Sequence, residues 1–90
     1  MSISLTSREI SNLLCRPHTA IRNRIKSRLT RHPELLKPLF EPRAFINDRQ
    51  RGDIEYVLGS AGIDYICGEF GQDGKRLREL VAIAEAVDTP

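Results

Sequence analysis

Two helix patterns separated by a proline are the strongest constraint on how this chain folds. Thr6-Ser7-Arg8-Glu9 has the form of a capping box, in which the Thr6 hydroxyl accepts from the Glu9 amide and the Glu9 carboxylate reaches back. Apolar residues at 10, 13 and 14 share the helical face that follows. The sequence therefore predicts a first helix over 7–14.

Pro17 ends this helix and begins another. The residue before a proline is pushed out of the α region, so Arg16 is expected to be non-helical, and a proline suits the first position of a helix. Apolar residues at 21, 25 and 29 then recur at helical spacing, before Pro33. The sequence predicts a second helix over 17–31. Two short helices joined by a tight turn predict a helix-turn-helix.

The second helix is unusually basic. No acid lies between Arg16 and Arg31, whereas a merely solvated helix mixes both signs to gain i,i+4 pairs. Residues 1–51 hold 11 Lys and Arg against 4 acids, a net +7, and residues 52–90 hold 3 against 8, a net −5. This segregation indicates a face for a polyanion, kept separate from the rest of the molecule. Ordinary scatter of surface charge is the alternative.

The second half of the chain begins with β-forming residues. Strands near 43–46 and 54–58 are expected, joined by a polar turn whose tip carries Arg49 and Arg51. A hairpin that follows a helix-turn-helix is a wing, and a basic tip suits the DNA backbone. Ser60 is expected to cap a helix that runs to about 70. Residues 71–74 are predicted to form a loop before a last helix over 75–87. Residues 1–5 are expected to form a weakly anchored N-terminal segment.

Ninety residues support a single domain with one compact core. We predict an α+β fold, namely a small winged helix-turn-helix domain with a two-stranded hairpin and C-terminal helices. The helix-turn-helix is expected over 6–38, the hairpin wing over 39–58 and the C-terminal helices over 59–88. The apolar stripe of the last helix has two expected destinations, the domain itself or a second copy of the chain. Because one core is thin at this size and duplex operators often have two-fold symmetry, we expect a homodimer.

Several classes of function find no support in the sequence. Cys15 and Cys67 are too few for a secreted disulfide framework, which favours a reduced, cytoplasmic protein. Cys15-x-x-His18 offers only two of the four ligands that structural zinc needs, so no metal site is expected. No stretch has the apolar length of a membrane span and no signal peptide is evident. We expect no enzyme, no cofactor and no small-molecule ligand.

The chain contains Thr6-Ser7-Arg8-Glu9-Ile10 and, after a short gap, His18-x-x-Ile21-x-x-x-Ile25. With these motifs and the order of its elements, it resembles the Rha family of phage regulatory proteins from about Leu5 to Val87. The likeness begins in the helix-turn-helix, where the family pattern is S-x-E-I-A followed by H-x-x-V-x-x-x-I. The chain departs from the family pattern at Ser11, Cys15 and Val87, and Cys15 stands where many helix-turn-helix turns have glycine. The further matching stretches are Phe40 followed by Phe45-Ile46-Asn47, Tyr56-Val57-Leu58 followed by Ala61-Gly62-Ile63, and Gly71 or Gly74 followed by Ile83-Ala84-Glu85-Ala86.

The resemblance implies a regulator of phage or prophage transcription, in the cytoplasm of a bacterial host and associated with its nucleoid. From the residues themselves, double-stranded DNA is the expected partner, with the helix over 17–31 in the major groove. Arginine fits the guanine edge and asparagine the adenine edge, while the first turn of helix 7–14 suits either a phosphate or a plain cap. The candidate DNA-binding residues are Ser7, Arg8, His18, Thr19, Arg22, Asn23, Arg24, Lys26, Arg28, Arg31, Arg49 and Arg51.

The alternative function is a protein-interaction module, such as an antirepressor or an inhibitor of a host factor. In that case the acidic second half is the working surface. RNA binding is a third alternative, but aromatic residues make up only 6% of the chain and offer no stacking platform.

Overall fold

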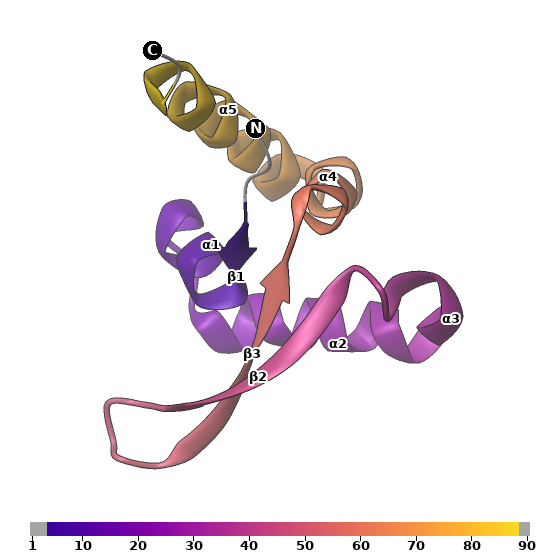
Figure 1. Cartoon of the computed structure of the whole chain (residues 1–90), viewed down its shortest axis with the longest axis vertical. Helices are drawn as coiled ribbons and strands as arrows, with labels where there is room; N and C mark the ends of the chain where they lie inside the picture. Colours follow the sequence, from indigo (N-terminus) through magenta and orange to yellow (C-terminus); the bar gives the residue numbers. More distant parts are fainter. Residues whose placement is uncertain (1–3, 89–90) are drawn as a thin grey trace.

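The structure, a computed structural model, describes residues 4–88. The predicted α+β class is confirmed, because the described residues form five helices and a three-stranded antiparallel sheet. A long hairpin projects at one end of the molecule and two stacked helices lie at the other (Figure 1). In chain order the elements are β1 (Leu5–Thr6), α1 (Ser7–Leu14), α2 (His18–Arg31), α3 (Pro33–Leu36), β2 (Phe40–Ile46), β3 (Gly52–Leu58), α4 (Ser60–Glu69) and α5 (Gly71–Asp88).

The hairpin of β2 and β3 is longer than expected. Phe40 pairs with Leu58 at its base and Ile46 with Gly52 near its tip, so each strand extends beyond the predicted limits of 43–46 and 54–58. The base lies in the core, whereas the turn between the strands projects beyond the helices (Figure 1). The hairpin therefore anchors one end of the sheet in the domain and exposes the other.

A third strand completes the sheet in the order β1-β3-β2. Leu5 pairs with Leu58 and Thr6 with Val57, so the expectation of a loose lead over 1–5 is wrong for Leu5. Residues 1–3 lie outside the described residues. A strand of two residues has no alternation for the sequence to reveal, but its pairing covers the last two residues of the free edge of β3. α1 follows directly, so β1 fixes where that helix starts.

The capping box of α1 forms as predicted. The Thr6 amide donates to Glu9 Oε1 (2.9 Å) and the Glu9 amide donates to Thr6 Oγ1 (3.1 Å). The helix ends at Cys15, which takes the left-handed conformation with φ of 54°. A side chain in that conformation costs roughly 1–2 kcal/mol. The turn before α2 therefore has a cysteine at a left-handed position that favours glycine.

Two helices start differently from the prediction. Pro17 is the N-cap of α2 in an extended conformation, φ −60° and ψ 140°, and not its first helical residue. Gly59 is the N-cap of α4 and offers no side-chain bond, so Ser60 is the first helical residue and not the cap.

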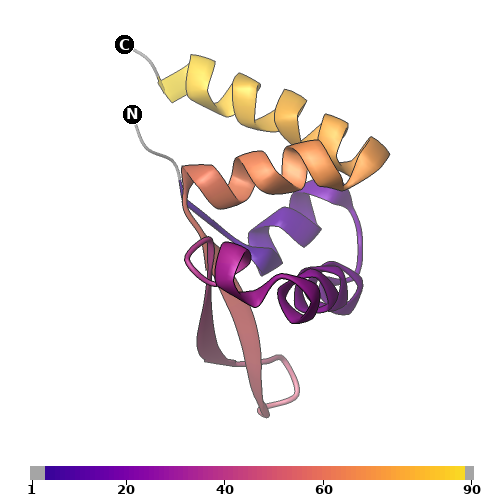
Figure 2. The same ribbon diagram turned by 90° about the vertical axis from the view of Figure 1, so that its right-hand side faces the viewer.

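The predicted loop over 71–74 is wrong, because α5 starts at Gly71. The chain reverses direction at Phe70, and Gly71 takes a φ of 59° that favours glycine. Three residues later, a Cβ added to Gly74 would lie 2.5 Å from the Cys67 carbonyl oxygen and 2.6 Å from that of Ile66. Both glycines are therefore needed for the sharp corner and the close crossing of α4 and α5 (Figure 2).

One apolar core lies between the helix pair α1 and α2, the helix pair α4 and α5, and the base of the hairpin (Figures 1 and 2). α5 contributes one fully buried aliphatic side chain from its first half. The core side chains are Ile10, Leu14, Ile21, Ile25, Leu36, Phe40, Leu58, Ile63, Ile66, Cys67, Phe70 and Leu77.

Two helical glycines give a matched test of the crossing. We expect Gly74→Ala to lower the free energy of unfolding by about 1–3 kcal/mol, because its Cβ meets the α4 backbone. Gly68→Ala, at an open position of α4, should raise it by up to about 1 kcal/mol. Urea denaturation of both variants measures the difference, and a stabilising Gly74→Ala would contradict the close approach.

Candidate nucleic-acid interface

α2 has one buried face and one solvent-exposed face. Ile21 and Ile25 are buried in the core. The opposite face carries exposed polar side chains three, four, seven and eight positions apart, so they form one row along the helix. We call this row the polar ridge; it consists of Thr19, Asn23, Lys26, Ser27 and Thr30.

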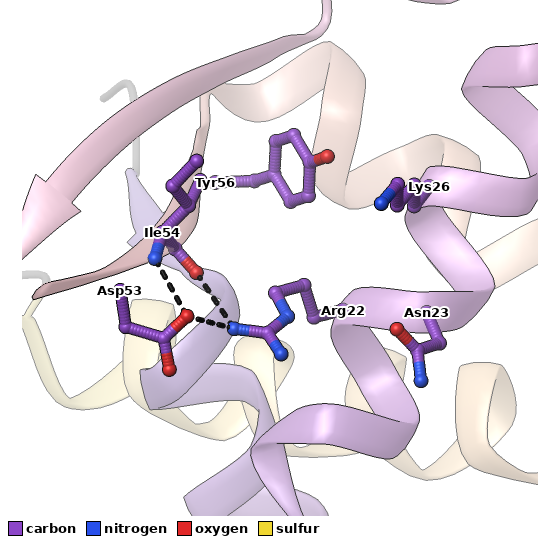
Figure 3. Close-up of a pocket in the computed structure, with 6 residues that line it drawn as sticks. All are labelled: Arg22, Asn23, Lys26, Asp53, Ile54 and Tyr56. Atoms are coloured by element: carbon purple, nitrogen blue, oxygen red, sulfur yellow. Dashed lines mark hydrogen bonds and ion pairs between the residues drawn. The ribbon is translucent and has the colours of Figure 1, made fainter.

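One flank of α2 is tied to the hairpin. Nη1 of Arg22 donates to the Asp53 carboxylate and, at 3.4 Å, to the Ile54 carbonyl oxygen (Figure 3). The Ile54 amide also donates to Asp53 Oδ1 (2.8 Å). This backbone bond, together with the Arg22 guanidinium, holds the pKa of Asp53 below its ordinary value. The carboxylate is therefore ionised and keeps Arg22 turned toward the hairpin.

The other flank of α2 is tied to the corner between α4 and α5. Arg24 donates to Asp73 Oδ2 (3.0 Å) and to the Phe70 carbonyl oxygen (3.3 Å), with its guanidinium 4.0 Å from the centroid of the Phe70 ring. Arg28 donates to the Glu69 carbonyl oxygen (3.0 Å) and lies 5.2 Å from the same ring. Aromatic stacking and ion pairing together hold both arginines against the body of the protein.

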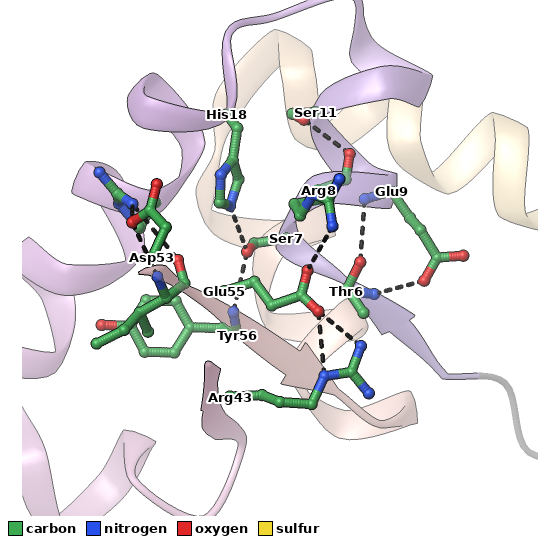
Figure 4. A network of polar contacts seen from close by, with 12 residues as sticks. Thr6, Ser7, Arg8, Glu9, Ser11, His18, Arg43, Asp53, Glu55 and Tyr56 are labelled. Carbon is green, nitrogen blue, oxygen red and sulfur yellow. Dashed lines mark hydrogen bonds and ion pairs between the residues drawn. The ribbon is translucent and has the colours of Figure 1, made fainter. Parts of the chain in front are cut away.

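A third cluster joins α1 to the sheet (Figure 4). Glu55 is 2% exposed and accepts from Arg43 Nη2 (2.6 Å), while Arg8 Nη1 lies 3.8 Å from its other oxygen. The Arg8 guanidinium also lies 4.2 Å from the centroid of the Phe45 ring. A buried carboxylate requires such compensation, so Arg8 and Arg43 stabilise the strand pair.

Ser7 and His18 link α1, α2 and β3. Ser7 is fully buried, and its hydroxyl accepts from the Tyr56 amide (3.0 Å) and shares a hydrogen bond with His18 Nε2 (2.8 Å). Burial lowers the pKa of His18 below its ordinary value, and the positive charges of Arg22 and Arg8 act in the same direction. Ser7 is therefore buried within the fold, whereas His18 is half-buried and lines a surface groove beside Arg8 and Thr19.

These contacts correct the interpretation of the segregated charge. The basic first half is not kept apart from the acidic second half; the two halves fold onto each other. Arginines of the first half pair with carboxylates that follow residue 51. These arginines lie on α1, α2 and β2 and in the loop between α1 and α2. The pairs are Arg8 and Arg43 with Glu55, Arg16 and Arg24 with Asp73, Arg22 with Asp53, and Arg28 with Glu69.

A different set of bases remains available to a ligand. Lys26 and Arg31 on α2 are exposed, and no hydrogen bond or ion pair engages their side chains within residues 4–88. The same holds for Arg49 and Arg51 at the hairpin tip, where only their backbone amides bind, donating to Asn47 Oδ1 (2.9 and 3.0 Å). These four bases and the polar ridge are the surface that a polyanion would meet.

A polar groove of about 280 Å³ lies between α2 and the hairpin. Arg22, Asn23 and Lys26 form one wall, and Asp53, Ile54 and Tyr56 form the other (Figure 3). The groove thus connects the polar ridge to the strands that lead to the basic tip.

The predicted site residues fall into three groups. Thr19, Asn23, Lys26, Arg31, Arg49 and Arg51 are exposed and available, as expected. Arg8, Arg22, Arg24 and Arg28 pair with carboxylates, while Ser7 is buried and His18 is half-buried.

Three residues of this surface were not predicted. Ser27 and Thr30 each lie four residues after a predicted contact, so helical spacing could have indicated them. Tyr56 lines the groove from β3, and no local pattern indicates it.

The chain matches no protein-family model, no curated protein and no solved structure.

Neither a membrane span nor a metal cluster is found in the part of the chain that the structure describes. No helix there has the length and apolar character that a bilayer requires, and no three or more His, Cys, Asp or Glu side chains gather in a metal-binding arrangement. Cys15 is an exposed free thiol and Cys67 a buried one.

Arg24 and Lys26 offer a matched comparison within α2. We expect Arg24→Ala to lower the free energy of unfolding by about 1 kcal/mol, since it removes a partly screened ion pair and a cation–π contact. Lys26→Ala should change it by less than about 0.5 kcal/mol. Urea denaturation measures both values, and equal effects would argue against the inward role of Arg24.

The lowered pKa of His18 makes stability depend on pH. Between the folded and unfolded pKa values the unfolded chain binds more protons, so this contribution is complete above about pH 6.5 and is lost as the pH falls. We expect the free energy of unfolding to decrease between about pH 7.5 and about pH 5.5, and His18→Gln to make that decrease shallower. His32→Gln, which removes an exposed imidazole, is the control. Parallel profiles for wild type and His18→Gln would rule the effect out.

Proposed function

We propose that the protein is a winged helix-turn-helix protein that binds double-stranded DNA sequence-specifically. In this proposal it is a non-enzymatic regulator of phage or prophage transcription, of the Rha type. The observation that carries the proposal is the polar ridge of α2, which is exposed and lies beside a hairpin with two available arginines at its tip. The major groove of B-DNA is about 12 Å wide and admits one α-helix.

The flanking ion pairs support α2 as the reading helix. Arg22 and Arg24 diverge to opposite sides of the helix, toward Asp53 and Asp73, so the row between them faces outward. A helix held on both flanks keeps its ridge in one orientation, which base recognition requires. The arginines thus position the helix, and the smaller side chains between them read the DNA.

Base-edge chemistry assigns roles along the ridge. Asn23 has the donor and acceptor pair that fits adenine N6 and N7, and Lys26 suits guanine O6 and N7. Thr19 offers a methyl group and a hydroxyl to a neighbouring base or phosphate. Arg31 at the end of α2, and Arg49 and Arg51 at the hairpin tip, lie beyond the ridge and suit phosphates.

The alternative, a protein-interaction module that uses the acidic second half, finds less support. Asp53, Glu55, Glu69 and Asp73 are engaged by arginines of the first half. At least four of the eight carboxylates that follow residue 51 are therefore occupied within the molecule.

A randomised duplex pool tests the proposal most directly. The purified protein is titrated against the pool at two salt concentrations, and the bound fraction is sequenced. Enrichment of a short motif, with affinity that falls as salt rises, is the expected result. Binding without enrichment would make the protein a general DNA binder, and an absence of binding at both salts would favour the protein-interaction alternative.

Single substitutions then test the assigned roles. We expect Lys26→Ala to weaken binding to the enriched duplex by about tenfold, and Asn23→Ala to relax the preference at one base pair. Lys37→Ala, which removes an exposed lysine beyond α2, is the control for Lys26. Fluorescence anisotropy gives the affinities and circular dichroism checks the fold. Unchanged affinity in folded Lys26→Ala and Asn23→Ala would exclude the polar ridge as the reader.

A further inference from the structure

Arg22 lies directly beside the polar ridge. Thr19 precedes it by three residues and Lys26 follows it by four, so the three side chains are neighbours on the surface of α2. The Arg22 side chain is 22% exposed and lines the same groove as Asn23 and Lys26 (Figure 3). A DNA duplex that met the ridge would therefore come within reach of Arg22 as well, unless another contact held the guanidinium away.

Asp53 supplies that contact from the opposite wall of the groove. Its carboxylate accepts from Arg22 Nη1 and, at 2.8 Å, from the Ile54 amide (Figure 3). The amide fixes the carboxylate on β3, so the pair opens only if the long Arg22 side chain moves. The hairpin thus holds one arginine of the candidate interface on its own side of the groove.

The arginine on the other flank of α2 is held by more contacts. Arg24 has its ion pair with Asp73, a hydrogen bond to the Phe70 carbonyl oxygen and a stacking contact with the Phe70 ring at 4.0 Å. Arg22 has its pair with Asp53, whose side chain is 31% exposed, and a longer bond of 3.4 Å to the Ile54 carbonyl oxygen. Removal of the Asp53 charge would therefore release Arg22.

A released arginine at this position would change what α2 recognises. Arginine bound to guanine O6 and N7 is the commonest base-specific contact, and an arginine that neutralises a phosphate strengthens binding to every duplex. While Asp53 is present, either contact would leave its carboxylate unpaired beside a polyanion, which costs free energy. The pair thus favours recognition by the smaller side chains of the polar ridge.

We propose that Asp53 is a positioning residue that sets the specificity of the interface, because it keeps Arg22 away from the DNA. Asp53 acts through Arg22 and does not itself contact a base. Asn23 and Lys26 read base edges, and Arg22 adds neither a phosphate contact nor a guanine contact. This inference rests on the proposed DNA binding, and it gives the hairpin a part in sequence preference besides its basic tip.

Asp53→Asn tests this role, since asparagine keeps the size of the side chain and removes its charge. Wild type and variant are titrated with a duplex that lacks the enriched motif, over a range of salt concentrations. If Arg22 moves to a phosphate, we expect the plot of log affinity against log salt to become steeper by about 0.9, with affinity at least about threefold higher at low salt. If it moves to a base, the randomised pool bound by the variant should gain a guanine position that the wild-type motif lacks.

Two comparisons separate the release of Arg22 from a general loss of negative charge. Asp48→Asn removes an exposed acid from the turn of the same hairpin and should give neither the steeper slope nor the new guanine position. Arg22→Gln with Asp53→Asn should give the same slope and motif as Arg22→Gln alone, because the arginine to be released is absent. Circular dichroism checks that each variant is folded.

The outcomes distinguish this inference from the function on which it rests. Sequence-specific binding by wild type, with an Asp53→Asn variant of unchanged slope and motif, would overturn the role of Asp53 and leave the DNA-binding proposal standing. A gain that persists without Arg22 would do the same. An absence of binding to any duplex, by wild type and by Asp53→Asn, would overturn both.

Discussion

Carboxylates from late in the sequence hold α2 on both of its flanks. Asp53 fixes Arg22 on the side of the hairpin, and Asp73 fixes Arg24 at the corner between α4 and α5. Ordering a long side chain costs conformational entropy, and the Phe70 ring adds stacking to offset that cost on one side. Because both flanks are engaged, the row of residues between them has to face outward. The orientation of the candidate interface thus depends on these two contacts together with the burial of Ile21 and Ile25 on the inner face of α2.

Local patterns predicted the elements that have local causes. The capping box at Thr6 and Glu9 and the break before Pro17 are signals within a few residues, and α1 and α2 follow them closely. β1 was not predicted, because a strand of two residues has no periodicity. The start of α5 was not predicted, because its glycines indicated a loop. Gly71 and Gly74 have the composition of a loop, yet one supplies a positive φ and the other a close helix crossing.

The candidate site was predictable only where side chains point to solvent. Thr19, Asn23 and Lys26 follow from helical spacing alone. The orientations of the arginine side chains do not follow from spacing, because a guanidinium on a long flexible side chain pairs with the nearest carboxylate. The tertiary structure determines which carboxylate is nearest. Arg16 and Asp73 are 57 residues apart. A count of positive charges along the helix therefore overstated how many of them are available to a ligand.

The long sequence separation of these pairs also sets the order in which the molecule is completed during synthesis. A ribosome releases the N-terminal residues first, so α2 emerges before Asp53, Glu69 or Asp73 exists. Until the corner at Phe70 has left the exit tunnel, the arginines of α2 lack their partners and the helix lacks its final orientation. The outward orientation of the polar ridge is therefore completed only in chains that have been translated past α4. A product truncated before that corner would retain the positive charge but lack the geometry.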